Sequence, residues 1–118
     1  MSKRKTIFLD IDGTILTHPG PVSPLLVKRE PEVLPGVHAK LSEWLAQDYC
    51  VIITTARREP LRDFTEKQLR DAKIDYDYLL MGIGSGERVV INDNKPGMEC
   101  TCRAITINRN EGLENVDV

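Results

Sequence analysis

The sequence has little of what characterises several large classes of protein. Its 118 residues include three cysteines, and its net charge at pH 7 is −2. Three cysteines are too few for a disulfide scaffold, and a nearly neutral chain creates no field that attracts nucleic acid or a membrane surface. No apolar run is as long as a membrane span or a signal-peptide core. We therefore expect one cytoplasmic domain over residues 1–118, with no nucleic-acid or membrane partner.

Two common cofactor motifs are also missing. Cys100 and Cys102 are spaced C-x-C instead of the C-x-x-C of zinc and redox sites, and this spacing favours reduced thiols. Gly82, Gly84 and Gly86 do not form G-x-G-x-x-G, and no helical pattern follows them. A dinucleotide site is therefore not expected.

The sequence does contain an alternation of strand-like and helix-like segments. Five short apolar runs are typical of buried strands: 6–9, 50–55, 76–81, 88–91 and 103–107. Two amphipathic segments lie between the first three runs. Runs this continuous indicate burial on both faces of a parallel sheet. The pattern predicts an α/β fold, a Rossmann-like, three-layer, doubly wound parallel sheet.

The spacing of apolar residues predicts two helices. The stripe of the first helix is formed by Val37, Leu41, Trp44 and Leu45. Pro60 suits the first turn of the second helix, and Lys67 with Asp71 adds an i,i+4 ion pair to its exposed side. Both helices are expected to cover the sheet.

The segment 15–33 is interrupted by residues that break regular structure. These breakers are Pro19, Gly20, Pro21, Pro24 and Pro31. They argue against a helix, and we predict an exposed loop excursion with a short hairpin around His18–Pro21. Long loops without regular structure are often functional.

The first predicted strand runs directly into Asp10, Ile11, Asp12 and Gly13. In an extended segment, positions i and i+2 point to the same side, so the two carboxylates lie together. Two like charges are costly because each raises the pKa of the other, and a cation between them removes that cost. Oxygen ligands of this kind suit Mg²⁺. The competing interpretation is a turn in which Asp and Gly are only turn formers.

Polar residues also follow two other predicted strands. Thr54 and Thr55 end the run at 50–55, and Asn92 and Asp93 follow the run at 88–91. In parallel sheets of this class, ligands bind at the carboxyl ends of the strands. The sequence therefore predicts that the three polar clusters meet at one edge.

The segment Phe8–Thr14 resembles the first motif of the haloacid dehalogenase (HAD) superfamily of phosphatases and phosphotransferases. The resemblance implies that Asp10 is the nucleophile that attacks phosphorus and that Asp12 is the general acid and base. It also implies a divalent metal ion beside them.

The segment Val51–Arg57 resembles the second motif of that family, whose Ser or Thr donates to a phosphoryl oxygen. Thr55 is the favoured donor because family members often continue with a small residue and arginine; Thr54 stays open. Arg57 is either a substrate or phosphate ligand or an exposed salt-bridging arginine. The phosphate- and substrate-binding set then comprises Thr55, Thr54, Arg57, Arg88 and Gly13.

The fourth and third motifs depart from the family pattern. Val89–Asp93 resembles the fourth motif, but its first acidic position is Asn92, whose amide oxygen can ligate Mg²⁺ without bringing charge. We expect Asn92 and Asp93 to complete the metal site with Asp10 and Asp12. No lysine lies between Lys73 and Asn92. We favour Arg88 in place of the family's third-motif lysine; the alternatives are Lys73 and Lys95.

The resemblance implies a single HAD-like hydrolase domain without a separate cap domain, in which 15–33 is the flap. The expected activity is Mg²⁺-dependent hydrolysis of a small phosphate ester, such as a sugar phosphate, through an aspartyl-phosphate. Transfer to another acceptor is not separated from hydrolysis. Capless members act on large substrates or close their sites with a neighbouring subunit, so a homo-oligomer is one expectation.

Two other functions compete with the phosphatase. The first is a catalytically weak or inactive binding module, favoured by Asn92 and the missing lysine. The second is a receiver-like phosphoacceptor domain. Such a domain carries its acceptor aspartate after a middle strand, where this chain has Thr54–Arg57, and its acidic pair is adjacent. Site geometry, more than shared fold, separates these functions.

Overall fold

The structure, a computed structural model, describes residues 4–20 and 30–118. Its elements follow in the order β1 (Thr6–Asp10), α1 (Val37–Ala46), β2 (Cys50–Thr54), the 3-10 turn η2 (Glu59–Leu61), α2 (Arg62–Asp71) and β3 (Tyr78–Leu80). No helix within the described ranges is long and apolar enough to cross a membrane.

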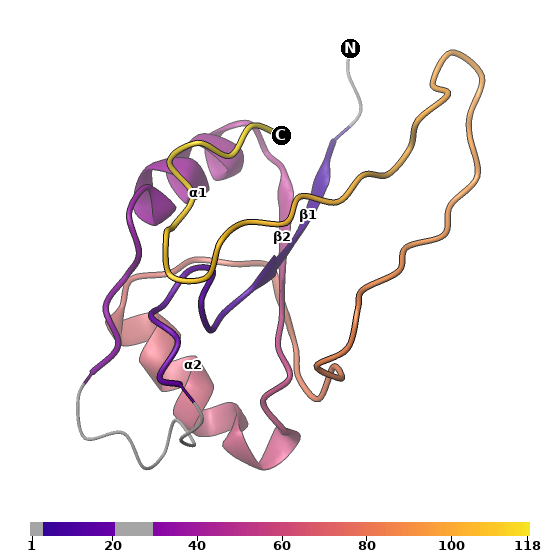
Figure 1. Cartoon of the computed structure of the whole chain (residues 1–118). Coiled ribbons are helices and arrows are strands. Elements are labelled where there is room, and N and C mark those ends of the chain that lie inside the picture. Colours follow the sequence, from indigo (N-terminus) through magenta and orange to yellow (C-terminus); the bar gives the residue numbers. More distant parts are fainter. Residues whose placement is uncertain (1–3, 21–29) are drawn as a thin grey trace.

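The three strands form a parallel sheet in the order β1-β2-β3. Figure 1 labels the first two of them, β1 and β2. Each strand lies beside the previous one, so the two right-handed crossovers place α1 and α2 on the same face of the sheet. The predicted α/β class and parallel sheet are confirmed by this arrangement. A second helical layer is not present in the part of the chain that the structure describes.

The core lies between this face of the sheet and the two helices. The register places Leu9, Ile53 and Leu79 side by side across the three strands, and all three are buried. The predicted stripe of α1 is confirmed, because Val37, Leu41 and Trp44 are buried and Leu45 is partly buried against the core. These contacts hold the strands parallel and bring their carboxyl ends to one edge.

The second helix also agrees with its prediction. Pro60 lies in η2, directly before α2, where its missing N–H costs no helical hydrogen bond. Lys67 Nζ and Asp71 Oδ2 lie 2.6 Å apart on the exposed side of α2. The helix is attached to the core mainly through the buried residues Thr65 and Leu69.

The predicted strands at 88–91 and 103–107 are wrong, because neither segment pairs with a neighbour among the described residues. Residues 84–106, here called the arm, leave the sheet after β3 and return as an extended excursion that projects from the molecule (Figure 1). The arm reverses direction at Lys95–Met98, where the two backbones exchange hydrogen bonds of 2.9 and 2.8 Å. An apolar run indicates strand propensity, but a strand needs a partner for its backbone groups.

The loop excursion predicted at 15–33 needs a correction at its ends. Ile15 and Leu16 are fully buried, and Leu16 forms an antiparallel bridge with Val33. Thr17 N–H donates to the Glu32 carbonyl at 3.0 Å, so the two ends of the excursion lie side by side. The chain therefore enters and leaves it through the core. Pro21 and the rest of 21–29 lie outside the described residues.

The C-terminal segment after the arm packs on the core. Leu113 is 2% exposed, and its N–H donates to the Pro35 carbonyl at 2.8 Å. At Gly112 the backbone has φ of +88°, and an added Cβ would lie 2.2 Å from the same Pro35 oxygen. This glycine is required by close packing as well as by conformation. The segment is therefore part of the fold.

Replacement of Leu113 tests this role. We expect Leu113→Ala to lower the free energy of unfolding by about 2–4 kcal/mol, because it leaves a cavity in the core. The exposed neighbour Asn115→Ala is the control and should change it by less than about 0.5 kcal/mol. Urea denaturation measures both. Equal stability of the two variants would mean that the C-terminal segment does not belong to the core.

Candidate active site

The acidic pair is placed by a tight turn at the end of β1. The Ile11 carbonyl accepts hydrogen bonds from the N–H groups of Thr14, Ile15 and Leu16, and Ile11 itself is fully buried. Gly13 has φ of +88°, and an added Cβ would lie 2.9 Å from the side chain of Arg109. A glycine is therefore needed at this position, and its role in the predicted site is to make the turn.

Asp10 lies at the carboxyl end of β1 in a partly desolvated position. Burial raises the pKa of its carboxyl above the ordinary value of 3.8, and the nearby charge of Asp12 adds to the increase. A hydrogen bond from the Ile11 backbone and the charges of Arg88 and His18 act in the opposite direction. The two aspartates, Arg88 and His18 therefore interact electrostatically at this edge of the sheet.

Asp12 is held by the guanidinium of Arg57. Arg57 Nε donates to Oδ2 at 3.0 Å and Nη2 donates to Oδ1 at 2.7 Å, so the two groups form a bidentate pair. The Arg57 side chain is 4% exposed and that of Asp12 is 20% exposed. Charge-assisted pairs of this geometry fix orientation as well as adding energy. The Asp12 carboxylate is thus presented in one direction.

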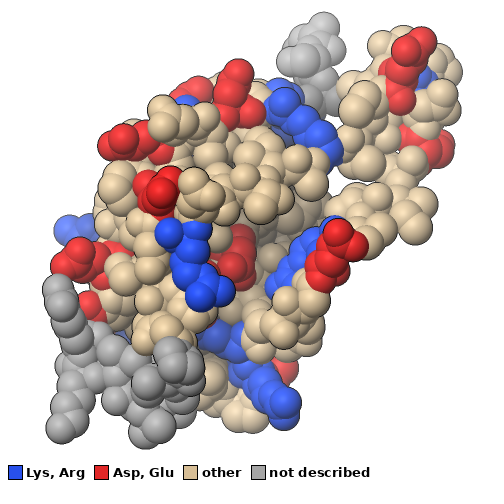
Figure 2. Space-filling view, in the orientation of Figure 1, with Lys and Arg blue, Asp and Glu red and all other residues tan. Residues whose placement is uncertain are grey.

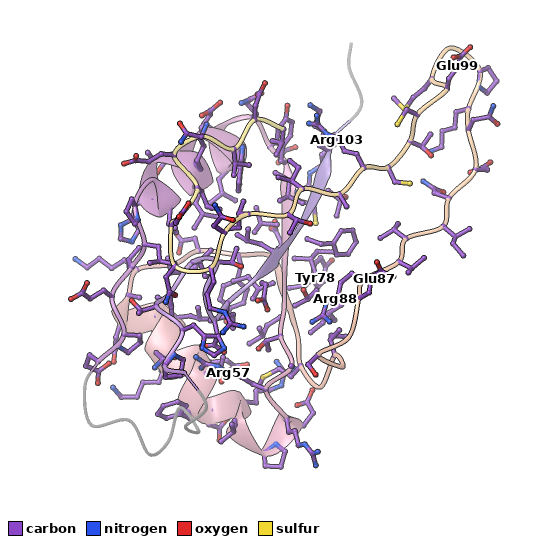
Figure 3. All side chains as sticks on the ribbon, viewed as in Figure 1. Arg57, Tyr78, Glu87, Arg88, Glu99 and Arg103 are labelled. Atoms are coloured by element: carbon purple, nitrogen blue, oxygen red, sulfur yellow. The ribbon has the colours of Figure 1, made fainter. Side chains whose placement is uncertain are left out.

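Arg57 is itself held by α2. Its Nη1 donates to Thr65 Oγ1 at 3.2 Å and to Gln68 Oε1 at 2.7 Å. Figure 3 labels Arg57 beside this helix. With these contacts and Asp12, its donors are largely engaged inside the protein. Of the two roles that the sequence left open for Arg57, the structure places it as a salt-bridging residue, buried instead of exposed.

The loop after β2 is connected to the end of β3. The Thr55 N–H donates to the Leu80 carbonyl at 3.0 Å, and the Thr55 carbonyl accepts from Ile83 N–H at 2.9 Å. Gly82 N–H donates to the Arg57 carbonyl at 2.7 Å. These bonds hold the backbone of the loop that carries Arg57 against the end of β3.

The two threonines that end the second strand both lie beside the acidic turn. Thr54 is paired in register with Asp10 and is partly exposed. Thr55 is almost fully buried, and its hydroxyl oxygen accepts the Arg57 backbone N–H at 3.1 Å. The structure therefore brings both candidate hydroxyls to the edge that carries Asp10, as the parallel topology predicts.

Asn92 and Asp93 are not at this edge. Both lie on the arm and are exposed. Among residues 4–20 and 30–118, no group of three or more His, Cys, Asp or Glu side chains could hold a metal ion, so Asp93 does not join Asp10 and Asp12. Of the three polar clusters predicted to meet at one edge, the aspartates and the threonines do so. The third cluster, Asn92 and Asp93, does not, because the segment 88–91 has no strand partner in the described chain. A ligand role for Asn92 and Asp93 stays a prediction.

Of the three candidates for the role of the third-motif lysine, Arg88 is the one that interacts with Asp10. Its charge lowers the pKa of Asp10, which Lys73 and Lys95 are not found to do. In Figure 3 its side chain lies near Tyr78 on the open side of the sheet, and its guanidinium donates to the Gly84 and Gly86 carbonyls. Lys73 follows α2, and Lys95 lies at the end of the arm.

The C-terminal segment adds residues that the sequence did not indicate. Arg109 packs over Gly13, and Asn110 N–H donates to the Gly13 carbonyl at 2.9 Å. Asn110 Oδ1 accepts the His18 N–H at 2.7 Å. No motif or spacing signals these contacts, because about 90 residues of sequence separate the partners.

Figure 2 shows basic side chains on both sides of a small acidic patch in the middle of this face.

No family model and no curated protein sequence matches this chain. A chain in the solved structure titled "Structure of Pnkp1/Rnl/Hen1 complex" is similar, with 28% identity and a TM-score of 0.56. The match covers 73% of this chain but only 30% of that one, so this chain corresponds to less than a third of the solved protein. The likeness supports a small α/β fold with a parallel sheet.

Proposed function

We propose that this protein is a Mg²⁺-dependent phosphomonoester hydrolase of the HAD-like type, acting through an aspartyl-phosphate. The observation that carries the proposal is the contrast between its two neighbouring carboxylates. Arg57 holds Asp12 in a bidentate pair, whereas Asp10 lies desolvated at the strand end, with no such partner among the described residues. Phosphoryl transfer through a carboxylate needs this division between one nucleophile and one oriented acid–base group.

The proposed reaction has two steps. A carboxylate oxygen of Asp10 attacks phosphorus, and the bond from phosphorus to the ester oxygen breaks. Asp12, which enters this step protonated, gives its proton to the departing oxygen. In the second step Asp12 takes a proton from a water molecule, whose oxygen attacks phosphorus. This step releases inorganic phosphate and restores the Asp10 carboxylate.

Other residues at the edge of the sheet support the phosphoryl group. A hydroxyl proton of Thr55 or Thr54 donates to a phosphoryl oxygen, and Thr55 is held in place by its backbone bonds to β3. Arg88 provides positive charge near Asp10 and can bind a phosphate in a bidentate manner.

We propose that the two carboxylates at this edge hold Mg²⁺ in an open site. Mg²⁺ keeps several waters and is often bound by one or two carboxylates together with substrate phosphate oxygens. Asp10 has a carboxylate outside the Arg57 pair and would hold the ion, with Asp12 beside it. When bound, the ion supplies charge that stabilises the phosphoryl oxygens.

The proposed fold is the three-layer, doubly wound HAD-like arrangement without a cap domain, of which residues 4–20 and 30–118 form the parallel sheet and one helical layer. Its support is the described parallel sheet and the acidic pair at the carboxyl end of β1. The proposed substrate is a small phosphate ester such as a sugar phosphate. A cytoplasmic location is proposed because all three cysteines are free thiols.

A substrate panel tests the activity. We expect release of phosphate from at least one phosphate monoester in the presence of Mg²⁺, and little release when EDTA replaces the metal. Asp10→Asn should lower the turnover by about a thousandfold or more, because it removes the nucleophile. The exposed Asp75→Asn is the matched control and should leave turnover unchanged.

Unchanged metal-dependent turnover in Asp10→Asn would overturn the proposed mechanism. Beryllofluoride gives an independent measurement, because it binds to a carboxylate that accepts phosphate. Wild type and Asp75→Asn should bind it with Mg²⁺, and Asp10→Asn should not.

The raised pKa of Asp10 predicts how stability depends on pH. Above its folded-state pKa, the ionised carboxyl costs folding free energy, and this cost fades as the pH falls through that pKa toward 3.8. In EDTA at pH 7, Asp10→Asn should therefore be more stable than wild type, and the difference should shrink at acid pH. Urea denaturation over a pH series measures it. A difference that does not vary with pH would contradict the assignment.

Arg57 is proposed to act through Asp12, as a positioning residue. Arg57→Lys keeps a positive charge beside Asp12 but cannot form the bidentate pair. We expect kcat to fall by about 10- to 100-fold with little change in KM, because the acid–base group loses its orientation. The exposed neighbour Arg58→Lys is the control. If kcat and KM in Arg57→Lys match those of the control while thermal unfolding changes, the role of Arg57 is structural only.

A non-catalytic binding module is the second candidate. It is favoured by the location of Asn92 and Asp93 on the arm, which leaves two carboxylates at the described part of the site. Such a module would bind a phosphate ester without releasing inorganic phosphate. Calorimetric binding to a member of the panel, without turnover, would favour this function over the hydrolase.

A further inference from the structure

One face of the sheet carries large apolar side chains that no element of the described chain covers. Phe8 on β1 and Tyr78 on β3 flank Ile52 in the register, and they are 58% and 61% exposed. Leu80, two residues beyond Tyr78, lies on the same face and is also exposed. Both described helices pack on the opposite face. A contiguous apolar patch on a sheet indicates an interaction surface.

The arm carries a second apolar surface. Its exposed members are Val89, Val90, Ile91, Met98 and Ile105, and Ile91 is 92% exposed. The arm is anchored at both ends, by the Ile83 bond to Thr55 and by the Asn110 bond to Gly13. In Figure 3 the arm passes Tyr78 at Glu87 and Arg88 and then moves away, toward Glu99 at its far end. Its apolar stretch therefore stands apart from the chain's own sheet.

The molecule exposes more surface than a compact monomer of its size. Its accessible surface is 8472 Å², whereas a folded monomer of 13.3 kDa exposes about 6,500 Å². Its radius of gyration is 14.9 Å, against about 13.5 Å for a compact domain of this length. The excess is on the order of 2,000 Å², and a stable dimer needs only about 800 Å² from each partner.

The charges of the arm favour a partner that is itself nearly neutral. The arm contains three acidic and three basic residues: Glu87, Asp93 and Glu99, and Arg88, Lys95 and Arg103. An arm without net charge has no general attraction for nucleic acid or for an anionic membrane. A second copy of the chain, with a net charge of −2, meets this condition.

We propose that the protein forms a symmetric dimer in which the arm of each copy covers the open sheet face of the other. The apolar arm residues then pack on the sheet face formed by Phe8, Tyr78 and Leu80 in the second copy. Because each chain carries one arm and one open face, a two-fold pair satisfies both surfaces and leaves no open end for further assembly. The proposal does not depend on the phosphatase activity.

Two exposed substitutions test the proposal. Tyr78→Lys changes the sheet face and Ile91→Glu changes the arm, while Ser42→Lys and Ser42→Glu on the outer side of α1 are matched controls. Sedimentation equilibrium of the full chain, under reducing conditions, should show a dimer for wild type and both controls. Each of the first two variants should raise the dimer Kd by about tenfold or more. Circular dichroism checks that both remain folded.

Mixing Tyr78→Lys with Ile91→Glu distinguishes exchange of arms from other contacts. A mixed pair keeps one unaltered arm on one unaltered face. In its other contact the introduced carboxylate lies opposite the introduced ammonium group, so we expect mixing to restore the dimer.

Three outcomes would overturn the proposal. The first is a monomeric wild type. The second is an unchanged dimer Kd in Ile91→Glu, which would indicate that the two copies contact each other through their sheet faces instead of through the arms. The third is failure of mixing to restore the dimer, which would show that Ile91 of one copy does not lie against Tyr78 of the other.

Discussion

The bidentate pair between Arg57 and Asp12 joins the parts of the structure on which the candidate site depends. It connects the turn after β1 with the loop after β2, and Thr65 and Gln68 extend the connection to α2. Because the pair is largely buried, removal of one partner would leave a poorly solvated charge, at a cost of about 3–5 kcal/mol in typical cases. The same interaction that orients Asp12 therefore also holds two loops of the sheet edge together.

The two carboxylates at the end of β1 differ because their surroundings differ. Asp12 has a guanidinium that accounts for both of its oxygens, whereas Asp10 is desolvated and feels the charge of Asp12. Placing an ionised carboxylate at Asp10 costs folding free energy, which is a common property of groups that react. Parallel strands end at the same edge of the sheet, so the polar residues at their carboxyl ends lie together there. The apolar residues earlier in the strands face the core.

The open face of the sheet follows from the order of the strands. Successive strands added on the same side place both crossover helices on one face, and the chain after β3 forms the arm in place of a covering layer. Apolar residues on that face and on the arm are then left exposed together. A partner that buries both surfaces would supply the layer that the described residues do not.

Local features were determined by the sequence alone: the strand that ends at Asp10, the turn at Gly13, the buried stripe of α1, and Pro60 before α2. Each depends on chemistry within a few residues, such as side-chain periodicity or a backbone that only glycine adopts. Tertiary structure alone decided that Arg57 pairs with Asp12, that Leu113 enters the core and that 88–91 finds no partner within the described chain. The physical reason is that the sequence shows which segments are apolar and which residues are charged. Only the folded chain determines which distant segment buries an apolar run or pairs with a charge.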